Sequence, residues 1–218
     1  MNPNHHRSTP DSPDAAASQG GTETPVWLLT GFGMFVVVIG YLLVTSLTPR
    51  RTVEYEPSPM QPADTRVTSL VYDTVTIDAL DPTTWRFFDF DRRSLVGVPD
   101  TTGWDLAVRR FMVIAADAAV DLGKVAFDEV VEAPSSNYVT TAFGRDTVNA
   151  ALERWYHYSL WSHLLEPNGH VYVVRTREGH YAKLEFLSYY CPGVVAGCLT
   201  FRYVYQPSEG GGFVSSEQ

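Results

Sequence analysis

The sequence has only two cysteines and few positive charges. Cys191 and Cys198 could form one disulfide at most, which excludes a disulfide-rich scaffold and a four-thiolate metal site. The chain holds 25 acidic residues against 16 lysines and arginines, for a formal net charge of -9. Nucleic-acid binding requires Lys and Arg clustered on one surface, and no such cluster occurs along the chain. Nucleic acid is therefore not an expected partner.

The common catalytic motifs are also missing. The chain contains no H-E-x-x-H or G-x-S-x-G pattern, and GGGF near the C-terminus lacks the Lys and Ser/Thr of a phosphate-binding loop. The scattered Ser, His and Asp residues do not form a pattern typical of nucleophilic catalysis. We therefore expect a protein that is not an enzyme and that has no metal site of its own.

One long hydrophobic run is present, PVWLLTGFGMFVVVIGYLLVTSLTPRR, over residues 25–51. Its uncharged part, Val26 to Leu47, would span ~33 Å as a helix at ~1.5 Å per residue, enough to cross a hydrocarbon core of ~30 Å. A cleavable signal peptide would need a positive N-terminal region, a shorter apolar stretch and an A-x-A-like site, and these are missing. We predict a retained, single-span transmembrane helix over residues 25–48.

Residues on one face of this run indicate possible membrane partners, and residues after its end indicate its orientation in the membrane. Gly33 and Gly40 lie on nearly the same helix face, where another membrane helix could approach closely, although glycine is simply common in membrane spans. Arg50 and Arg51 follow the run, and this positive charge favours a cytoplasmic C-terminal domain. The expected partners are the bilayer and other transmembrane subunits of a complex.

Composition divides the rest of the chain into four segments. Residues 1–24 are polar and rich in Pro, Ser and Gly, so we expect them to be disordered. Residues 49–66 form a proline-spaced linker that would hold the next domain off the membrane surface. Residues 67–206 carry the strand-like pattern of a β domain, and residues 207–218 are typical of a flexible tail.

Alternation with a period of two predicts a mainly antiparallel β domain with little helix. Val71, Val75 and Ile77 share one parity, and Arg177-Glu178-Gly179 is a plausible turn between the strands VYVVRT and HYAKLEFLSYY. LTFRYVYQ is predicted to be the closing strand, and WDLAVRRFMVI, from Trp104, another strand. The spacing in DTVNAALERW instead predicts a short helix.

Several residues have a structural interpretation. Arg109, Arg175 and Lys183 are expected on the strand face opposite the core, or in buried pairs with Asp105 or Glu185. The expected aromatic core residues are Trp85, Trp104, Tyr189, Phe201 and Tyr203. The two cysteines flank the small-residue loop PGVVAG, so they could be bonded outside the cytoplasm or act as two apolar fillers inside it.

The segments VTIDA, TTWRFFDF, GWDLAVRRF, WYHY, VYVVRTREGHYAKLEFLSYY and LTFRYVYQ resemble the HmuY-like proteins. The resemblance runs from about Val75 to Gln206. This is an all-β family whose founding members bind haem on the bacterial surface. It implies a domain outside the cytoplasm, against the two arginines after the apolar run. We therefore expect a single-pass protein of the bacterial inner membrane with a periplasmic domain, and a cytoplasmic domain remains the alternative.

In the founding members of this family two histidines bind the haem iron. The segment KVAFDEVVEAPSSNYV contains no histidine, so one expected ligand is missing. The other is expected near WYHYSL, where Leu160 takes its place between His157 and His163. On one continuous strand these candidate haem ligands would lie ~20 Å apart, too far to bind one iron. His170, His180 or a methionine could complete a pair with either.

Two functions fit this sequence. The first is an accessory or structural subunit of a larger membrane complex, respiratory or photosynthetic, which would need no cofactor. It follows from the retained anchor, the glycine face and the missing ligand. The second is a membrane-tethered haem- or tetrapyrrole-binding protein with a rearranged set of ligands, and it rests on the family resemblance.

Overall fold

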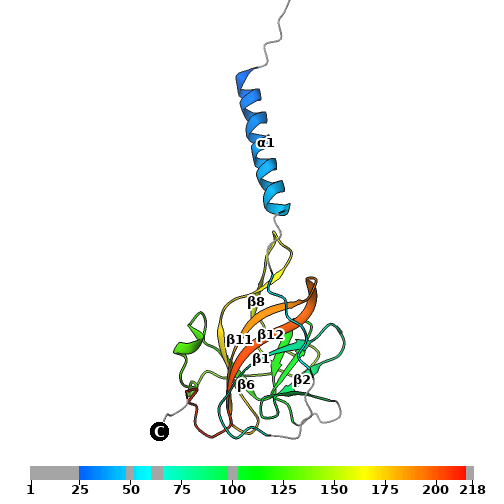
Figure 1. Cartoon of the computed structure of the whole chain (residues 1–218). Coiled ribbons are helices and arrows are strands. Elements are labelled where there is room, and N and C mark those ends of the chain that lie inside the picture. Colours follow the sequence, from blue (N-terminus) through cyan, green and yellow to red (C-terminus); the bar gives the residue numbers. More distant parts are fainter. Residues whose placement is uncertain (1–24, 48–51, 60–65, 98–102, 215–218) are drawn as a thin grey trace, which may run out of the picture. The chain divides into compact units, whose positions relative to one another are not determined.

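Helix α1, Val26–Leu47, begins and ends where the uncharged run does (Figure 1). Its side chains from Val26 to Thr45 are exposed, and its length and composition suffice to cross a membrane. The predicted apolar N-terminal helix is thus confirmed. The chain divides into the units Met1–Thr48 and Pro49–Gln218. The structure, a computed structural model, describes residues 25–47, 52–59, 66–97 and 103–214. The predictions for the tail over residues 1–24 and for Arg50 and Arg51 lie outside these residues.

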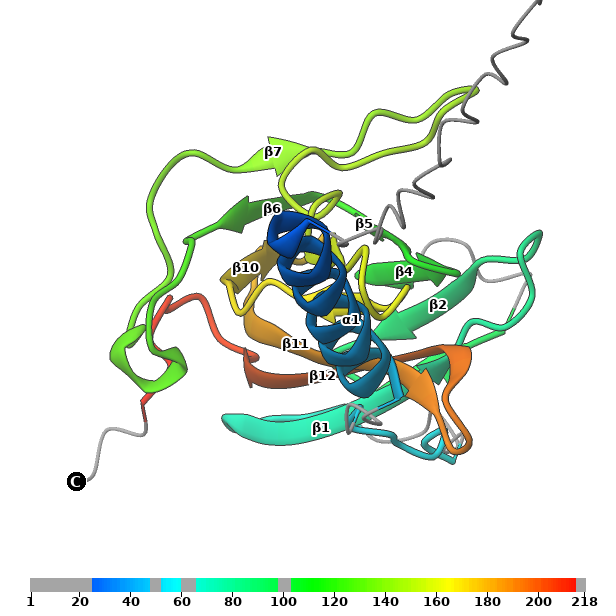
Figure 2. The ribbon, with the colours of Figure 1, turned by 90° about the horizontal axis from the view of Figure 1, so that it is seen from above.

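The second unit is a mainly antiparallel β domain, as predicted, and its described residues form three sheets (Figures 1 and 2). In chain order the elements are β1 (Val71–Asp78), β2 (Arg86–Asp89), β3 (Ser94–Val96), β4 (Leu106–Arg109), β5 (Met112–Ala115), β6 (Ala118–Asp121), the 3-10 helix η1 (Phe127–Glu129), β7 (Val139–Thr140), β8 (Tyr156–Tyr158), β9 (Leu165–Pro167), β10 (Val171–Arg175), β11 (Tyr181–Cys191) and β12 (Val195–Gln206). The sheets have the orders β1-β12-β11-β10-β6-β7, β3-β2-β4-β5 and β8-β9.

The six-stranded sheet is covered on both faces, and alternation along β12 shows how. Phe201 and Tyr203 point to the main core, where they meet Phe88 and Phe90 beside the four-stranded sheet. Val204 points to the opposite face and joins a second core. A sheet buried on both faces gives strands with nearly continuous apolar residues, which explains VYVVR in β10. Of the predicted aromatic core residues, Trp85 is only partly buried.

Of the predicted linker over residues 49–66, the structure describes residues 52–59 and 66, and residues 52–59 pack on the β domain. Glu54 forms a parallel bridge with Tyr190, and the Tyr55 amide donates to the Tyr190 carbonyl at 3.1 Å. The described part of this segment therefore belongs to the β domain, and whether the segment holds the domain off the membrane surface stays a prediction. Proline-rich composition predicts extended backbone, but it does not reveal whether that backbone finds a strand to pair with.

The predicted flexible tail over residues 207–218 is also corrected for its described part, residues 207–214. Phe213 is buried in the second core, together with Phe127. The Phe213 amide donates to the Val131 carbonyl at 2.8 Å. The glycines before Phe213 are typical of a flexible chain, yet the burial of one aromatic side chain is enough to hold the segment on the domain.

Two local predictions differ from the structure. WDLAVRRFMVI is a hairpin of β4 and β5 rather than one strand, because the chain turns at Arg110, which has a φ of 54°. The predicted helix in DTVNAALERW is a single turn, in which the amides of Leu152 and Glu153 both donate to the Asn149 carbonyl. The side chain of Asn149 is buried and donates to the Val139 carbonyl at 3.0 Å. This bond fixes the segment in a turn before Trp155 enters the core.

Cys191 and Cys198 form a disulfide across the β11–β12 loop, with their Cα atoms 4.9 Å apart. Replacing both with serine is expected to lower the free energy of unfolding by about 2 kcal/mol, because the bond restricts a short loop in the unfolded chain. Urea unfolding of the two proteins in detergent measures this difference. Equal midpoints, or two free thiols in the protein as isolated from membranes, would contradict the assignment.

Candidate functional site

The segment that contains His157 and His163 folds into the β8–β9 hairpin, residues 156–167. His157 pairs with Glu166 across the two strands, and the tip closes with the Ser159 amide donating to the Leu164 carbonyl at 2.9 Å. The continuous strand considered in the sequence analysis is therefore wrong, and so is the ~20 Å separation that it implied. Because the chain reverses here, both histidines lie on one small hairpin.

Each of these histidines is oriented by one hydrogen bond. His157 is 59% exposed, and its Nε2 lies 3.0 Å from a carboxylate oxygen of Glu166. His163 is exposed, and its Nδ1 lies 2.7 Å from the Tyr158 hydroxyl. In the described part of the chain, the other ring nitrogen of each histidine has no hydrogen-bond partner. An imidazole held by one nitrogen, with the other free, has the arrangement of a metal-bound histidine.

Exposed apolar side chains lie between the two histidines in the sequence, at the tip of the hairpin. Leu160 is 77% exposed and Trp161 is 75% exposed, while Tyr158 is about half exposed. Exposed aromatic and aliphatic side chains grouped on a short segment mark a binding surface more often than isolated ones do. The hairpin therefore offers imidazole ligands beside an apolar surface.

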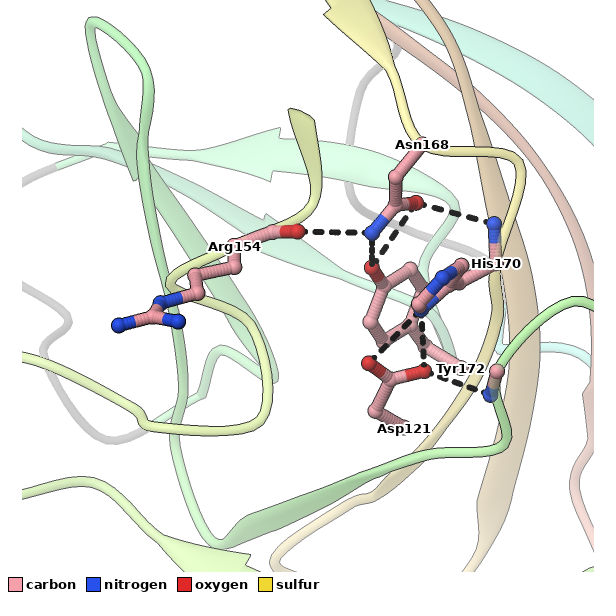
Figure 3. Close-up of polar contacts among 6 residues, drawn as sticks. Asp121, Arg154, Asn168, His170 and Tyr172 are labelled. Carbon is pink, nitrogen blue, oxygen red and sulfur yellow. Dashed lines mark hydrogen bonds and ion pairs between the residues drawn. The ribbon is translucent and has the colours of Figure 1, made fainter. Parts of the chain in front are cut away.

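A second polar cluster lies at the base of the hairpin and orients His170 (Figure 3). The Nδ1 of His170 lies 3.0 and 2.9 Å from the two carboxylate oxygens of Asp121, which also accept a hydrogen bond from the Gly123 amide at 2.7 Å. His170 is partly buried. His170 lies between β9 and β10, and its partner Asp121 is the last residue of β6. The pair therefore holds the start of β10 against the end of β6 in the six-stranded sheet.

Asn168 completes the cluster. Its amide nitrogen donates to the Arg154 carbonyl at 2.7 Å and to the Tyr172 hydroxyl at 2.9 Å, as Figure 3 shows. Burial raises the pKa of Tyr172, so this phenol keeps its proton. The cluster is consistent with a structural role. His180, the other proposed partner, has its Nδ1 at 3.0 Å from the Tyr205 hydroxyl, so both histidines are held by the six-stranded sheet rather than by the hairpin.

The segment without a histidine, KVAFDEVVEAPSSNYV, packs on the second core through η1. Lys183 is buried on that face, and its Nζ donates to the carbonyls of Phe127 and Val130, each at 2.8 Å. Burial lowers the pKa of Lys183. Of the two predicted alternatives, the strand face opposite the main core is found for Lys183, whereas the pairing with Asp105 or Glu185 is not, since its Nζ bonds to carbonyls and Glu185 pairs with Arg202 at 2.6 Å. Carbonyl partners on a distant loop have no signature in the sequence.

Two cavities in the described part of the β domain are small. One of about 170 Å³ lies between residues 52–53, residues 164–167 of the hairpin and residues 187–190 of β11. Another of about 200 Å³ lies beside β1 and β3. Sites for cofactor-sized ligands usually exceed ~300 Å³. Neither of these two cavities would enclose a tetrapyrrole, whereas the hairpin offers an open surface.

The side chains of the described residues do not form a metal-binding site by themselves. No group of three or more His, Cys, Asp or Glu residues in the described ranges could hold one. Haem needs fewer protein ligands than a free metal ion, because the porphyrin itself supplies four nitrogens and the protein adds one or two axial ligands. A single free imidazole nitrogen on the hairpin meets that demand.

Comparison with known proteins settles the family. The family model for HmuY protein matches residues 81–203. The chain belongs to the HmuY family. The resemblance inferred from the strand motifs is thus confirmed, and the match covers most of the β domain. No curated protein matches the chain.

Solved structures of several bacterial proteins show the same fold as this HmuY-family chain. The apo HmuY analogue of Tannerella forsythia has a TM-score of 0.58 and 18% identity, over 65% of this chain and 99% of its own. A candidate lipoprotein of Bacteroides fragilis has a TM-score of 0.54 and 19% identity, over 68% and 95%. A candidate HmuY-like haem-binding protein of Bacteroides vulgatus has a TM-score of 0.52 and 23% identity, over 66% and 94%.

Proposed function

We propose that this HmuY-family protein is a membrane-anchored haem- or tetrapyrrole-binding protein and that the β8–β9 hairpin is its binding surface. One observation carries the proposal: His157 and His163 each have one ring nitrogen bonded and the other free, beside exposed Leu160 and Trp161. Haem is itself a flat apolar group with a metal at its centre. An imidazole next to apolar side chains matches both of its properties.

Different residues of the hairpin would make different contacts with haem. Haem, when bound, supplies the iron and its four porphyrin nitrogens. His157 would offer Nδ1 as an axial ligand, while Glu166 fixes the tautomer and orientation of the ring through Nε2. His163 would offer Nε2, because the Tyr158 hydroxyl holds Nδ1. Leu160 and Trp161 would cover part of the porphyrin face.

The proposal includes a retained membrane anchor with the β domain outside the cytoplasm. The length and composition of α1 support the anchor, and the disulfide between Cys191 and Cys198 supports an oxidising compartment. The bacterial inner membrane with a periplasmic domain remains our expectation for the location. A signal sequence, which passes the same test of length and composition as an anchor, is the alternative for α1.

The accessory-subunit hypothesis has less support. Of the three similar proteins named above, one is described as a candidate haem-binding protein, one as a candidate lipoprotein and one as an HmuY analogue, and none of the three as a subunit of a respiratory or photosynthetic complex. Gly33 and Gly40 have open space where a side chain would be, so this face of α1 stays available to another helix. The haem-binding hypothesis therefore takes first place, and other membrane subunits remain proposed partners.

Titration of the full chain with haem in mild detergent tests the proposal. We expect a Soret shift that saturates, and about 10-fold weaker binding in Glu166→Gln, because this variant weakens the orientation of an axial ligand. The variant with both His157→Ala and His163→Ala should not bind. His180→Ala is the matched control, since His180 is held on the sheet by Tyr205. No saturable shift in the unmodified chain, or an unaltered shift in the double variant, would refute the proposal.

A further inference from the structure

The tip of the β8–β9 hairpin is apolar, uncharged and without cover. Residues 158–165, YSLWSHLL, contain no Asp, Glu, Lys or Arg, and Leu160 and Trp161 are the most exposed side chains among them. Covering a side chain of this size stabilises a complex by ~1.5 to 3 kcal/mol relative to leaving it in water. Figure 1 shows this yellow hairpin standing out from one end of the β domain.

The base of the same hairpin packs on the segment that follows the membrane helix. Tyr190 joins the two, because its hydroxyl accepts a hydrogen bond from the Leu165 amide at 2.7 Å and its carbonyl accepts one from the Tyr55 amide at 3.1 Å. The Ser188 hydroxyl donates to the Val53 carbonyl beside them. Thr52 and Val53 line one cavity with residues 164–167 of the hairpin.

Chain length then limits how far the hairpin can be from the bilayer. Helix α1 ends at Leu47, and Thr52 follows after five peptide steps. Because each step covers at most ~3.6 Å, Thr52 lies no further than ~18 Å from the end of the helix. From Tyr158 to Trp161 the chain can add at most ~10 Å at ~3.3 Å per residue. The chain length thus allows the tip of the hairpin to reach the surface of a membrane that α1 spans.

The chemistry of the tip matches one partner. Trp and Tyr concentrate at membrane–water interfaces, where an apolar ring lies next to polar headgroups, and Leu adds apolar area without a charge to desolvate. We propose that Tyr158, Leu160 and Trp161 insert into the interfacial layer of the bilayer that α1 spans and dock the β domain there. The inference rests on the proposed membrane anchor and describes the haem-free protein, because haem on the hairpin would compete with the bilayer for Leu160 and Trp161.

Nitroxide labels on the full chain in phosphatidylcholine–phosphatidylglycerol vesicles, without haem, test this docking. The native cysteines are bonded to each other, so Trp161→Cys provides a single reactive thiol. Phe143→Cys is the matched control, because Phe143 is also exposed but lies outside the hairpin, in the segment between β7 and β8. Val37→Cys, inside α1, reports on the anchor.

We expect a label at position 161 to collide more with oxygen, which partitions into lipid, than with a water-soluble nickel chelate. The label at position 143 should show the opposite preference, and the label at position 37 should be reached only by oxygen. A water-like label at position 161 with a lipid-like label at position 37 would overturn the docking and leave the anchor intact. A label at 161 shielded from both reagents would indicate a protein partner and overturn the docking. A water-like label at 37 would overturn the anchor and the docking together, whatever the haem titration shows.

Discussion

Trp155→Ala is expected to lower the free energy of unfolding by about 3 to 5 kcal/mol, the usual cost of truncating a buried Trp. Trp155 is fully buried, and its ring lies 4.9 Å from that of Phe186 and 5.1 Å from that of Tyr156. Its Nε1 donates to the Phe111 carbonyl at 2.8 Å. The variant therefore loses packing and leaves a carbonyl without its partner, at the point where the hairpin leaves the core.

Trp161→Ala is the matched control, since the same side chain is removed from an exposed position six residues further on. It should change the free energy of unfolding by no more than ~0.5 kcal/mol in detergent solution. Urea unfolding followed by circular dichroism compares the two variants with the unmodified chain. Similar losses in both variants would mean that the hairpin does not project from the core as described.

Asp105→Asn is expected to remove most of the pH dependence of stability between about pH 4 and pH 8. Asp105 is buried and accepts a hydrogen bond from the Phe90 amide at 2.9 Å. Burial is the largest cause that raises its pKa from 3.8 to about 8, and the negative charges of Asp89 and Glu178 add to the effect. The folded chain thus keeps a proton that the unfolded chain releases.

The direction of the effect follows from proton linkage. Because the folded state binds more protons than the unfolded state in this range, stability is highest near pH 4 and is lost as pH rises, by at most ~1.4 kcal/mol per pH unit. Asparagine keeps the acceptor for Phe90 and cannot ionise. The variant should therefore be more stable than the unmodified chain at pH 8 and similar to it at pH 4.

Thermal unfolding at pH 5 and pH 8 measures this slope. Asp89, whose pKa burial also raises, should leave a small residual slope in the variant. Asp81 does not interfere, because bonds from the Thr83 hydroxyl and amide lower its pKa to about 2, and its contribution is lost only below about pH 4. An unchanged slope in Asp105→Asn would show that Asp105 is ionised in the folded protein.

The regular part of the fold could be predicted from the sequence because its signals are local. The parity of Val75 and Ile77, and the turn at Arg177-Glu178-Gly179, describe one strand face and one hairpin, and both are found as predicted. The apolar run likewise gives α1 within a residue at each end. Periodicity and turn chemistry act within a few residues, so no distant partner is needed to interpret them.

The candidate site could be predicted only in part, because its geometry depends on a reversal of the chain. His157 and His163 were identified as candidates, but their parity was interpreted on a straight strand. The tip residues 158–165, YSLWSHLL, lack the Asn-Gly or Asp-Gly signal of a tight turn, so the β8–β9 hairpin could not be inferred. The contacts of Glu166 with His157 and of Lys183 with η1 join separate segments, and they became visible only in the structure.

Absorption spectroscopy of the native protein tests the central claim most directly. The chain is purified from membranes in mild detergent, its spectrum is recorded, and the proteins that migrate with it are identified. Our account predicts a Soret band that is absent from the protein carrying His157→Ala and His163→Ala. A colourless chain that migrates within a large membrane complex, and that Gly33→Leu or Gly40→Leu releases from it, would contradict the account and support the accessory-subunit hypothesis.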